Sequence, residues 1–364
     1  MRKITTLLAC LLCISSLQAA NKQSDLKKKL DNYIETAVMS KDVVGFNLAV
    51  VSADDVLYRG AFGVKNIYTQ EPVTSTSLFH IASVTKTFVG AALMQLHEQG
   101  KLDLDAPVTT VVPYFKLVDG RYKDLTIRQF ASHISGMPDF DSDPWHHKEY
   151  DDGALERFVR DFISHKFLTE APSTKYQYCN TGYELLGDVI AKASGMTFED
   201  YVHQHILKPL EMNSSTLLIR DADFSELNSL HHKKDGKNAV HDIYPYNRAH
   251  GPSSTMISNQ DDMIKYLQMY LNKGQLNGRQ LLSPAAVNAM FAPALGKFDN
   301  VGLSWHRKEQ DGQLVIYHGG NDGFKAYAAL VPELNIGIVF LTNTAHSPYH
   351  ELADNLVAIV KASL

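Results

Sequence analysis

The pattern of apolar and polar positions divides the chain into strand-like segments near both ends and helix-like segments between them. Residues 43–52 and 56–63 are short, mainly apolar runs joined by an Ala-Asp-Asp turn, which predicts two connected strands. Residues 314–317, 326–332 and 336–343 have the same character and predict successive antiparallel strands. We therefore expect one sheet that is built from both ends of the chain.

Apolar residues at helical spacing mark the chain between and beside these strands. The segment 180–194 is the clearest, because its apolar residues share one face and Gly195 ends the pattern. Two polar stretches, 140–153 and 229–250, interrupt the helices, and the first is expected to be a long exposed loop. The predicted helices span residues 25–41, 84–100, 125–136, 180–194, 261–273 and 349–362.

These elements predict an α+β fold. In it, an antiparallel β-sheet built from both termini is flanked by helices and carries a large, mainly helical inserted region. We assign the sheet region to residues 21–105 and 286–364, and the inserted region to residues 106–285.

Residues 1–20 have the composition of a secretory signal peptide. Two basic residues precede an apolar stretch, and small residues follow up to an expected cleavage site near Ala19 or Ala20. The apolar stretch is too short to span a membrane and no later segment reaches that length, so we expect no transmembrane segment. We expect an exported protein, periplasmic or secreted, that is not anchored as a lipoprotein through Cys10.

The charge balance and the cysteine count exclude some classes of partner and an internal disulfide. The chain has 35 basic and 40 acidic side chains and a net charge of −5, which argues against nucleic acid or an anionic membrane as a partner. Removal of the signal leaves Cys179 as the single cysteine, so the mature chain forms no internal disulfide. A chain of this length buries a core that needs none. Nothing in the sequence indicates the oligomeric state.

Ser83 and Lys86 lie at the mouth of the predicted helix 84–100. Residues three apart share a helical face, so the Lys86 ammonium is expected near the Ser83 hydroxyl. An amine of lowered pKa activates a serine by helping to remove its proton. The alternative is structural, with Ser83 as a helix N-cap and Lys86 as a solvated side chain. The same spacing occurs at Ser24 and Lys27, in a polar helix where we give it no catalytic meaning.

Tyr178 and Asn180 stand directly before the helix 180–194. Residues two apart in an extended segment face the same side, so a phenol and an amide are presented together. Beside a lysine ammonium, the phenol is expected to ionise more easily than usual and so to accept the serine proton. The structural alternative is a buried aromatic ring with Asn180 as the helix N-cap.

A glycine-rich segment, Tyr317 to Phe324, ends one of the predicted C-terminal strands. Consecutive glycines at Gly319 and Gly320 allow a substrate backbone to approach closely. One N–H of this segment, together with that of Ser83, would form a two-donor oxyanion hole. The alternative is a glycine-rich hairpin turn.

Other catalytic patterns fit poorly. No Gly-x-Ser-x-Gly stretch of an α/β-hydrolase occurs. His203 and His205 lack further ligands at metal-binding spacing, and the paired histidines at 146–147 and 231–232 lie in polar loops. We therefore expect no metal ion and no cofactor.

Together these segments resemble the serine β-lactamase and penicillin-binding protein superfamily, in particular its class C β-lactamase-like branch with D-peptidases, D-aminopeptidases and esterases. The order of Ser83, Tyr178 and His318 fits that family, and residues 100–108 and 125–138 are similar to the segments that follow its nucleophile helix. The resemblance spans nearly all of the chain after the signal.

The resemblance implies a role for each matching residue. Ser83 would be the nucleophile of an acyl-enzyme, with Lys86 and Tyr178 as the pair that transfers its proton. Asn180 would form a hydrogen bond with the substrate amide. The substrate would be a small molecule or a peptide.

The third motif departs from the family pattern, because lactamases have Lys-Thr-Gly where this chain has His318-Gly319-Gly320. An ungapped alignment would instead place Tyr317 at the lysine position. Strand alternation allows only one of Tyr317 and His318 to point into the site, and we favour His318. His318, Gly319, Gly320 and Asn321 are the expected substrate-binding residues of this segment.

The resemblance thus implies a serine hydrolase that acts through an acyl-enzyme on small esters, D-amino-acid-containing peptides or β-lactams. Because the lysine that would pair with a β-lactam carboxylate is absent, efficient antibiotic hydrolysis is not expected. The alternative is a non-catalytic protein that binds cell-wall peptides or penicillin and retains the fold.

Overall fold

The computed structural model describes residues 22–140, 145, 146 and 148–363. The predicted signal peptide, residues 1–20 with Cys10, lies outside the described residues, as does part of the predicted loop 140–153. Within the described chain, no helix combines the length and the apolar character needed to cross a bilayer.

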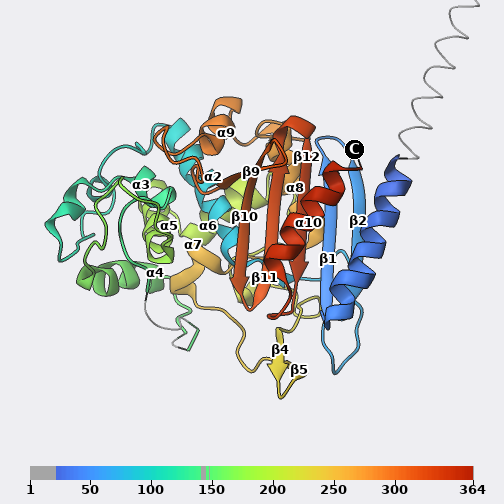
Figure 1. The fold of residues 1–364 in the computed structure, drawn as a ribbon. Coiled ribbons are helices and arrows are strands. Elements are labelled where there is room, and N and C mark those ends of the chain that lie inside the picture. The colour runs from blue at the N-terminus through green and yellow to red at the C-terminus, as the bar shows by residue number, and fades with distance from the viewer. Residues whose placement is uncertain (1–21, 141–144, 147, 364) are drawn as a thin grey trace, which may run out of the picture.

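A six-stranded sheet lies at the centre of the fold, with the strand order β2-β1-β12-β11-β10-β9 (Figure 1). All neighbouring strands are antiparallel, and the register sets Phe46 of β1 opposite Thr342 of β12. This confirms the α+β fold with one sheet built from both termini. The strands span Gly45–Ser52 (β1), Val56–Gly63 (β2), His306–Gln310 (β9), Gln313–Asp322 (β10), Phe324–Val331 (β11) and Ile336–Thr342 (β12).

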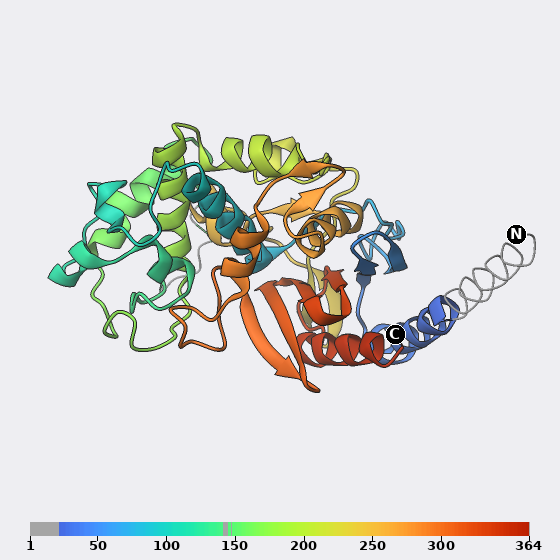
Figure 2. The same cartoon turned by 90° about the horizontal axis from the view of Figure 1, so that it is seen from above.

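Helices cover both faces of the sheet (Figures 1 and 2). The N-terminal helix, residues 22–33, and α10 (Tyr349–Lys361) share one core with apolar side chains of β1 and β12 such as Phe46 and Phe340. On the other face, α8 (Gln260–Leu271) packs against the same two strands. Strands covered on both faces bury nearly all of their side chains, which explains why β1 and β12 appear as mainly apolar runs.

The mainly helical part lies beside the sheet, to the left in Figure 1. Its central helix, α2, is buried from Thr85 to Leu96 and packs against α5, α6, α7 and α9. The helices of this part span Thr85–Glu98 (α2), Ile127–Ala131 (α3), Ala154–Arg157 (α4), Asn180–Ser194 (α5), Phe198–Val202 (α6), Gly251–Ser254 (α7) and Pro284–Phe291 (α9).

Short strands complete the fold. The pair β4–β5 forms a hairpin that projects from the body of the molecule, within a stretch predicted only as polar (Figure 1). The short strands span Phe79–His80 (β3), His231–Lys234 (β4), Lys237–Val240 (β5), Ile257–Ser258 (β6), Gln275–Leu276 (β7) and Arg279–Gln280 (β8).

The helix predicted over residues 125–136 is shorter than expected and ends at Ala131. Thr126 and Gln129 form a capping box at its start. At its end, His133 has a φ of +56°, and the N–H of Ile134 bonds to the carbonyl of Gln129. This is a Schellman ending, which a histidine provides here in place of the usual glycine.

Candidate active site

Ser83 lies in the 3-10 turn Ala82–Val84, directly before α2. The N-cap position of α2 is occupied by Val84, so the interpretation of Ser83 as an N-cap is wrong. The turn is held by Thr85, whose hydroxyl donates to the Ala82 carbonyl at 2.6 Å. Ala82 has a φ of +46°, a strained conformation for a residue with a side chain. The Ser83 hydroxyl is therefore free of capping and available to other groups.

Lys86 is fully buried and makes three short polar contacts through its Nζ atom. Nζ lies 2.9 Å from the Oγ of Ser83, 2.6 Å from Oδ1 of Asn180 and 2.7 Å from the backbone carbonyl of Ser253. Burial lowers the pKa of Lys86 to about 8, although nearby carboxylates, led by Glu184, oppose this shift. An amine with such a pKa exchanges its proton close to neutral pH.

Tyr178 lies on the other side of the serine. Its hydroxyl donates to the Ser83 Oγ at 2.9 Å, and the Lys86 Nζ lies 5.0 Å from the centre of its ring. Burial raises the pKa of Tyr178 well above its ordinary value, although the contact with Ser83 lowers it. The expectation that the neighbouring ammonium eases ionisation of this phenol is therefore wrong, and near neutral pH Tyr178 is a hydrogen-bond donor.

The N-cap of α5 is Cys179, whose Sγ accepts the N–H of Gly182 at 3.2 Å. The interpretation of Asn180 as the N-cap is therefore wrong, since Asn180 is the first helical residue. Sγ also lies 3.4 Å from the carbonyl of Pro138. The Cys179 side chain thus turns toward the protein interior, away from Ser83.

Asp139, which the sequence analysis did not single out, fixes the orientation of Asn180. Its carboxylate accepts the Asn180 N–H at 2.9 Å, the Asn180 Nδ2 at 2.7 Å and the Thr181 N–H at 3.1 Å. A carboxylate at the first turn of a helix satisfies unpaired N–H groups and is favoured by the helix dipole. Because Nδ2 is held by Asp139, Asn180 presents its carbonyl oxygen to Lys86.

Three histidines back the site, of which His133 and His318 are buried and His306 is partly exposed. The His133 ring stacks on Tyr178 at 4.4 Å, and its Nδ1 accepts the Cys179 N–H at 3.1 Å. The His306 ring lies 4.8 Å from that of His318 and 6.2 Å from that of His133. Burial lowers the pKa of all three rings, that of His306 to about 4, so they are neutral near pH 7. His133 and His306 gave no signal of their own in the sequence.

The glycine-rich segment of β10 lies directly against the Ser83 turn. A Cβ atom on Gly320 would be 2.5 Å from the Ile81 carbonyl oxygen and 2.8 Å from the Ser83 nitrogen. His318 is buried beside His306, whereas Tyr317 is partly buried against the core that α10 shares with β1 and β12, with its ring 5.4 Å from that of His306. Strand alternation puts His318 on the face of β10 that Gly320 turns toward Ser83, which favours His318, but both side chains line the pocket beside Ser83, so the choice between them stays a prediction.

We expect Gly320→Ala to slow the reaction of Ser83 with a fluorophosphonate by about a hundredfold or more, because the new methyl group meets backbone atoms and must displace the Ser83 turn. The measurement is the rate at which a fluorophosphonate labels Ser83. Gly120→Ala is the matched control, since no atom lies within 4 Å of a Cβ there. A Gly320→Ala variant that is labelled as fast as the wild type would contradict this packing.

Comparison with known proteins agrees with this geometry. A model of the beta-lactamase family matches residues 30–362. The chain belongs to the beta-lactamase family. It is a class C-like member of the serine β-lactamase and penicillin-binding protein superfamily, which confirms the resemblance found in the sequence. Members of this family act on small substrates.

Individual relatives of this beta-lactamase-family chain are distant. Protein flp of Staphylococcus aureus (strain MW2) is 25% identical over 338 residues, which cover 92% of this chain and 66% of that protein. The chain thus spans just under two thirds of the length of that relative. Penicillin-binding protein 4 of Amycolatopsis lactamdurans is 29% identical over 316 residues, or 83% of this chain and 81% of that protein. The octameric penicillin-binding protein homologue from Pyrococcus abyssi superposes with a TM-score of 0.78 at 25% identity, covering 92% of this chain and 77% of that one.

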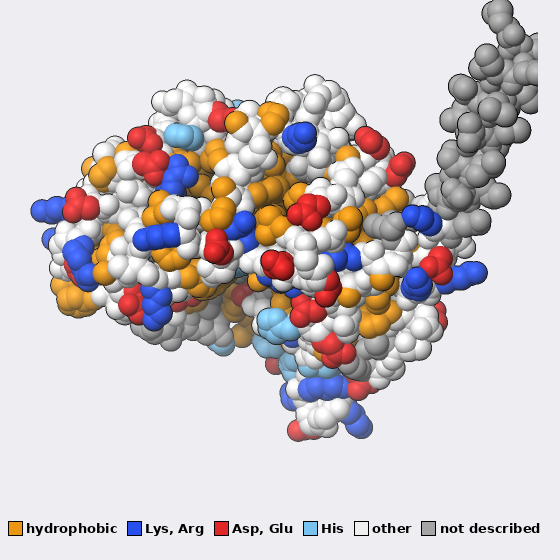
Figure 3. Space-filling model, turned by 45° about the horizontal axis from the view of Figure 1, so that its top comes forward, with side chains coloured by type: hydrophobic (Ala, Val, Ile, Leu, Met, Phe, Trp, Pro, Cys, Tyr) orange, Lys and Arg blue, Asp and Glu red, His pale blue; other side chains and the backbone are white. Residues whose placement is uncertain are grey.

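In this member of the beta-lactamase family, a cleft of about 570 Å³ opens above Ser83. It is bounded by Tyr178 and Asn180 on one side, by β10 on another and by the start of α10 at Tyr349. All of the site residues expected from the sequence line this cleft except Lys86, which lies beneath Ser83. On the surface shown in Figure 3, acidic and basic side chains are interspersed, and lysines gather at the projecting β4–β5 hairpin.

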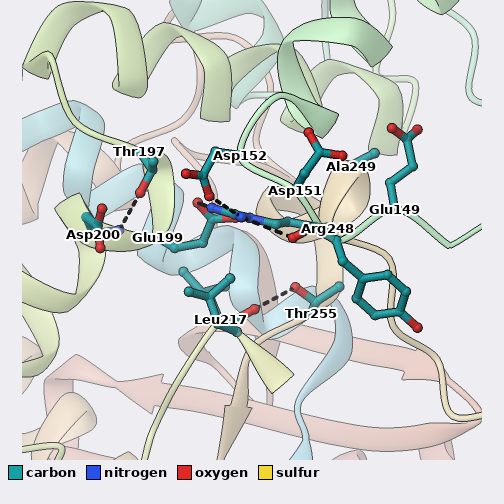
Figure 4. A network of polar contacts seen from close by, with 12 residues as sticks. Glu149, Asp151, Asp152, Thr197, Glu199, Asp200, Leu217, Arg248, Ala249 and Thr255 are labelled. Atoms are coloured by element: carbon teal, nitrogen blue, oxygen red, sulfur yellow. Dashed lines mark hydrogen bonds and ion pairs between the residues drawn. The ribbon is translucent and has the colours of Figure 1, made fainter. Parts of the chain in front are cut away.

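A buried arginine ties the end of the 140–153 loop to the scaffold of the site (Figure 4). The Arg248 guanidinium pairs with the Glu199 carboxylate at 2.8 Å and also contacts Asp152. The backbone N–H of Arg248 donates to the backbone carbonyl of Glu149 at 3.0 Å. The arginine stands shortly before α7, the helix that carries Ser253. The loop is thereby linked to the backbone that contacts Lys86.

Proposed function

We propose that this chain is a serine hydrolase in which Ser83 forms an acyl-enzyme with small esters or D-amino-acid-containing peptides, and that β-lactams are poorer substrates. The observation that carries the proposal is the arrangement of Lys86 and Tyr178 on either side of the Ser83 hydroxyl. The experiment that tests it is a screen of the purified protein with p-nitrophenyl esters, D-Ala-D-Ala peptides and nitrocefin.

The contacts of Lys86 favour it as the general base. Asn180 Oδ1 and the Ser253 carbonyl are acceptors only, so each takes one N–H of the lysine. A neutral lysine has two N–H bonds and one lone pair. With both N–H bonds engaged, the lone pair faces the Ser83 hydroxyl and can remove its proton.

Tyr178 then acts as a donor. Its hydroxyl points at the Ser83 Oγ, which steadies that oxygen as it attacks the acyl carbon. The proton taken by Lys86 is then given to the leaving group as its bond to the acyl carbon breaks, either by Lys86 itself or by way of the Tyr178 hydroxyl. The N–H of Ser83 and one from residues 319–321 would stabilise the oxyanion. The backbone at Gly320 approaches Ser83 closely enough for this role.

The charges of the cleft support a substrate without a carboxylate beside the reacting bond, which is a simple ester or a peptide cut away from its free C-terminal residue. A peptide cut directly before a C-terminal D-alanine is disfavoured for the same reason as a β-lactam. His318 occupies the position of the family lysine, and burial keeps it neutral by lowering its pKa. Lys308 also lines the cleft, but it is paired with Asp354 at 2.5 Å. Asp322 adds a further acidic group. A carboxylate in this cleft would meet more negative than positive charge.

We expect His318→Lys to raise the specificity constant for nitrocefin by about tenfold to a hundredfold, because a charge-assisted hydrogen bond to the carboxylate is gained. Hydrolysis of p-nitrophenyl butyrate should change little. Tyr317→Lys is measured alongside and should give a smaller gain, although Tyr317 also lines the cleft. A larger gain in Tyr317→Lys would assign the lysine position to Tyr317 instead. A wild-type nitrocefin value of about 10⁶ M⁻¹s⁻¹ or more would show the substrate preference to be wrong.

A further inference from the structure

A second buried carboxylate, that of Glu184, lies behind the catalytic lysine. Glu184 is on α5 one turn after Asn180, so both side chains project from the same face of the helix. The side chain is completely buried. Its Oε2 accepts the N–H of Ser253 at 3.1 Å, and its Oε1 lies 3.1 Å from Nδ1 of His250.

These contacts connect Glu184 to Lys86 through a single residue, Ser253. Ser253 donates its N–H to Glu184 and offers its carbonyl to Lys86. His250, the residue before α7, and Ser253 within α7 are thus both held by one carboxylate. Helices α5 and α7 pack closely enough for these contacts to form, because α5 has a glycine where they meet. A Cβ on Gly187 of α5 would lie 2.1 Å from a side-chain atom of Pro252. A shift of Glu184 would therefore move an oxygen that directs the Lys86 lone pair.

We propose that Glu184 is a positioning residue for proton transfer, which holds the Ser253 carbonyl against Lys86 and places a buried carboxylate behind the lysine. The proposal rests on the proposed function, because it assigns Lys86 as the base that activates Ser83. Glu184 itself does not line the cleft and touches no substrate.

The charge of Glu184 acts on Lys86 in a definite direction. Burial lowers the pKa of the lysine, and among the charged groups that raise it Glu184 comes first, before Asp322 and Asp139. Removal of the Glu184 charge should therefore let Lys86 lose its proton at lower pH. The other titratable groups that face Lys86 are Cys179, Tyr178, Tyr183, His133, His306 and His318, and His250 faces Glu184.

The test is the pH dependence of Ser83 labelling by a fluorophosphonate, which needs no knowledge of the natural substrate. In the wild type, the rate should rise with pH around the Lys86 pKa of about 8. In Glu184→Gln, the midpoint of this rise should move down by about one pH unit. Glu184→Met, which also lacks the charge, is measured alongside in case Glu184→Gln does not fold. The midpoint of either folded variant tests the inference. Glu184→Asp should keep the wild-type midpoint and react about tenfold more slowly, because its shorter side chain no longer holds Ser253.

Asp188→Asn is the matched control, since Asp188 is a buried carboxylate one turn further along α5 that bonds to Tyr114 instead. Its midpoint should equal that of the wild type. An unchanged or raised midpoint in folded Glu184→Gln or Glu184→Met would overturn the inference and leave the proposed function intact. Absence of labelling in the wild type at every pH would overturn the proposed function itself.

Discussion

Ser83→Ala should lower kcat/KM for every substrate of this protein by about 10⁴-fold or more, because no other group can form the acyl-enzyme. The side chains that surround the serine remain in place, so weak residual rate enhancement from binding and from the oxyanion hole is expected. The measurement is turnover of p-nitrophenyl butyrate, together with mass spectrometry of the protein after fluorophosphonate treatment.

The chain offers its own control for this substitution. Ser24 and Lys27 have the same spacing as Ser83 and Lys86, but they are exposed on the N-terminal helix. Ser24→Ala should leave activity and labelling unchanged. Activity of Ser83→Ala above a tenth of the wild-type value, at an unchanged thermal midpoint, would disprove the assignment of the nucleophile.

The second large effect concerns Lys86 and Tyr178. Lys86→Ala and Tyr178→Phe should each lower kcat/KM by about 10³-fold or more, and the double variant should be little worse than either one. The two groups share one task, because both contact the same oxygen atom of Ser83. Once one of the two groups is absent, proton transfer from Ser83 is already impaired, so removal of the other has little further effect.

Stability must be measured in the same variants. Lys86→Ala leaves the Asn180 and Ser253 carbonyls without a donor in a buried site, which costs about 1–3 kcal/mol of unfolding free energy for each unpaired group. Rates should therefore be compared well below the thermal midpoint of each variant. Fully additive losses in the double variant would show that the two residues act independently.

Much of the fold is predictable from local patterns. The bounds of α5 agree with the sequence prediction, because a clear apolar face and a left-handed Gly195 define the helix. Strand β9 was missed, since His306–Gln310 is a polar edge strand without alternation. The early end of α3 was missed because it depends on a histidine in a conformation more usual for glycine. Export through residues 1–20 stays a prediction.

The sequence predicted only those site residues that belong to a recognisable motif. Ser83, Lys86 and Tyr178 were each marked by a recognisable spacing, and the structure brings all three within hydrogen-bonding distance. Asp139 and Glu184 carry no such mark, because each acts through contacts that packing creates between distant segments. The protonation of Tyr178 was misjudged, since the sequence does not reveal how deeply its ring is buried.

The central position of β12 has a consequence for how the chain folds. The last strand in the sequence pairs with β1 on one side and β11 on the other, so the sheet closes only when its C-terminal segment is available. Contacts between such distant segments make folding slow, because a very long loop must be ordered first. The position of β10 against Ser83 depends in turn on β11. A growing chain therefore contains Ser83 long before the site around it can assemble, and we expect the proposed activity to be acquired only when the final strand has been made.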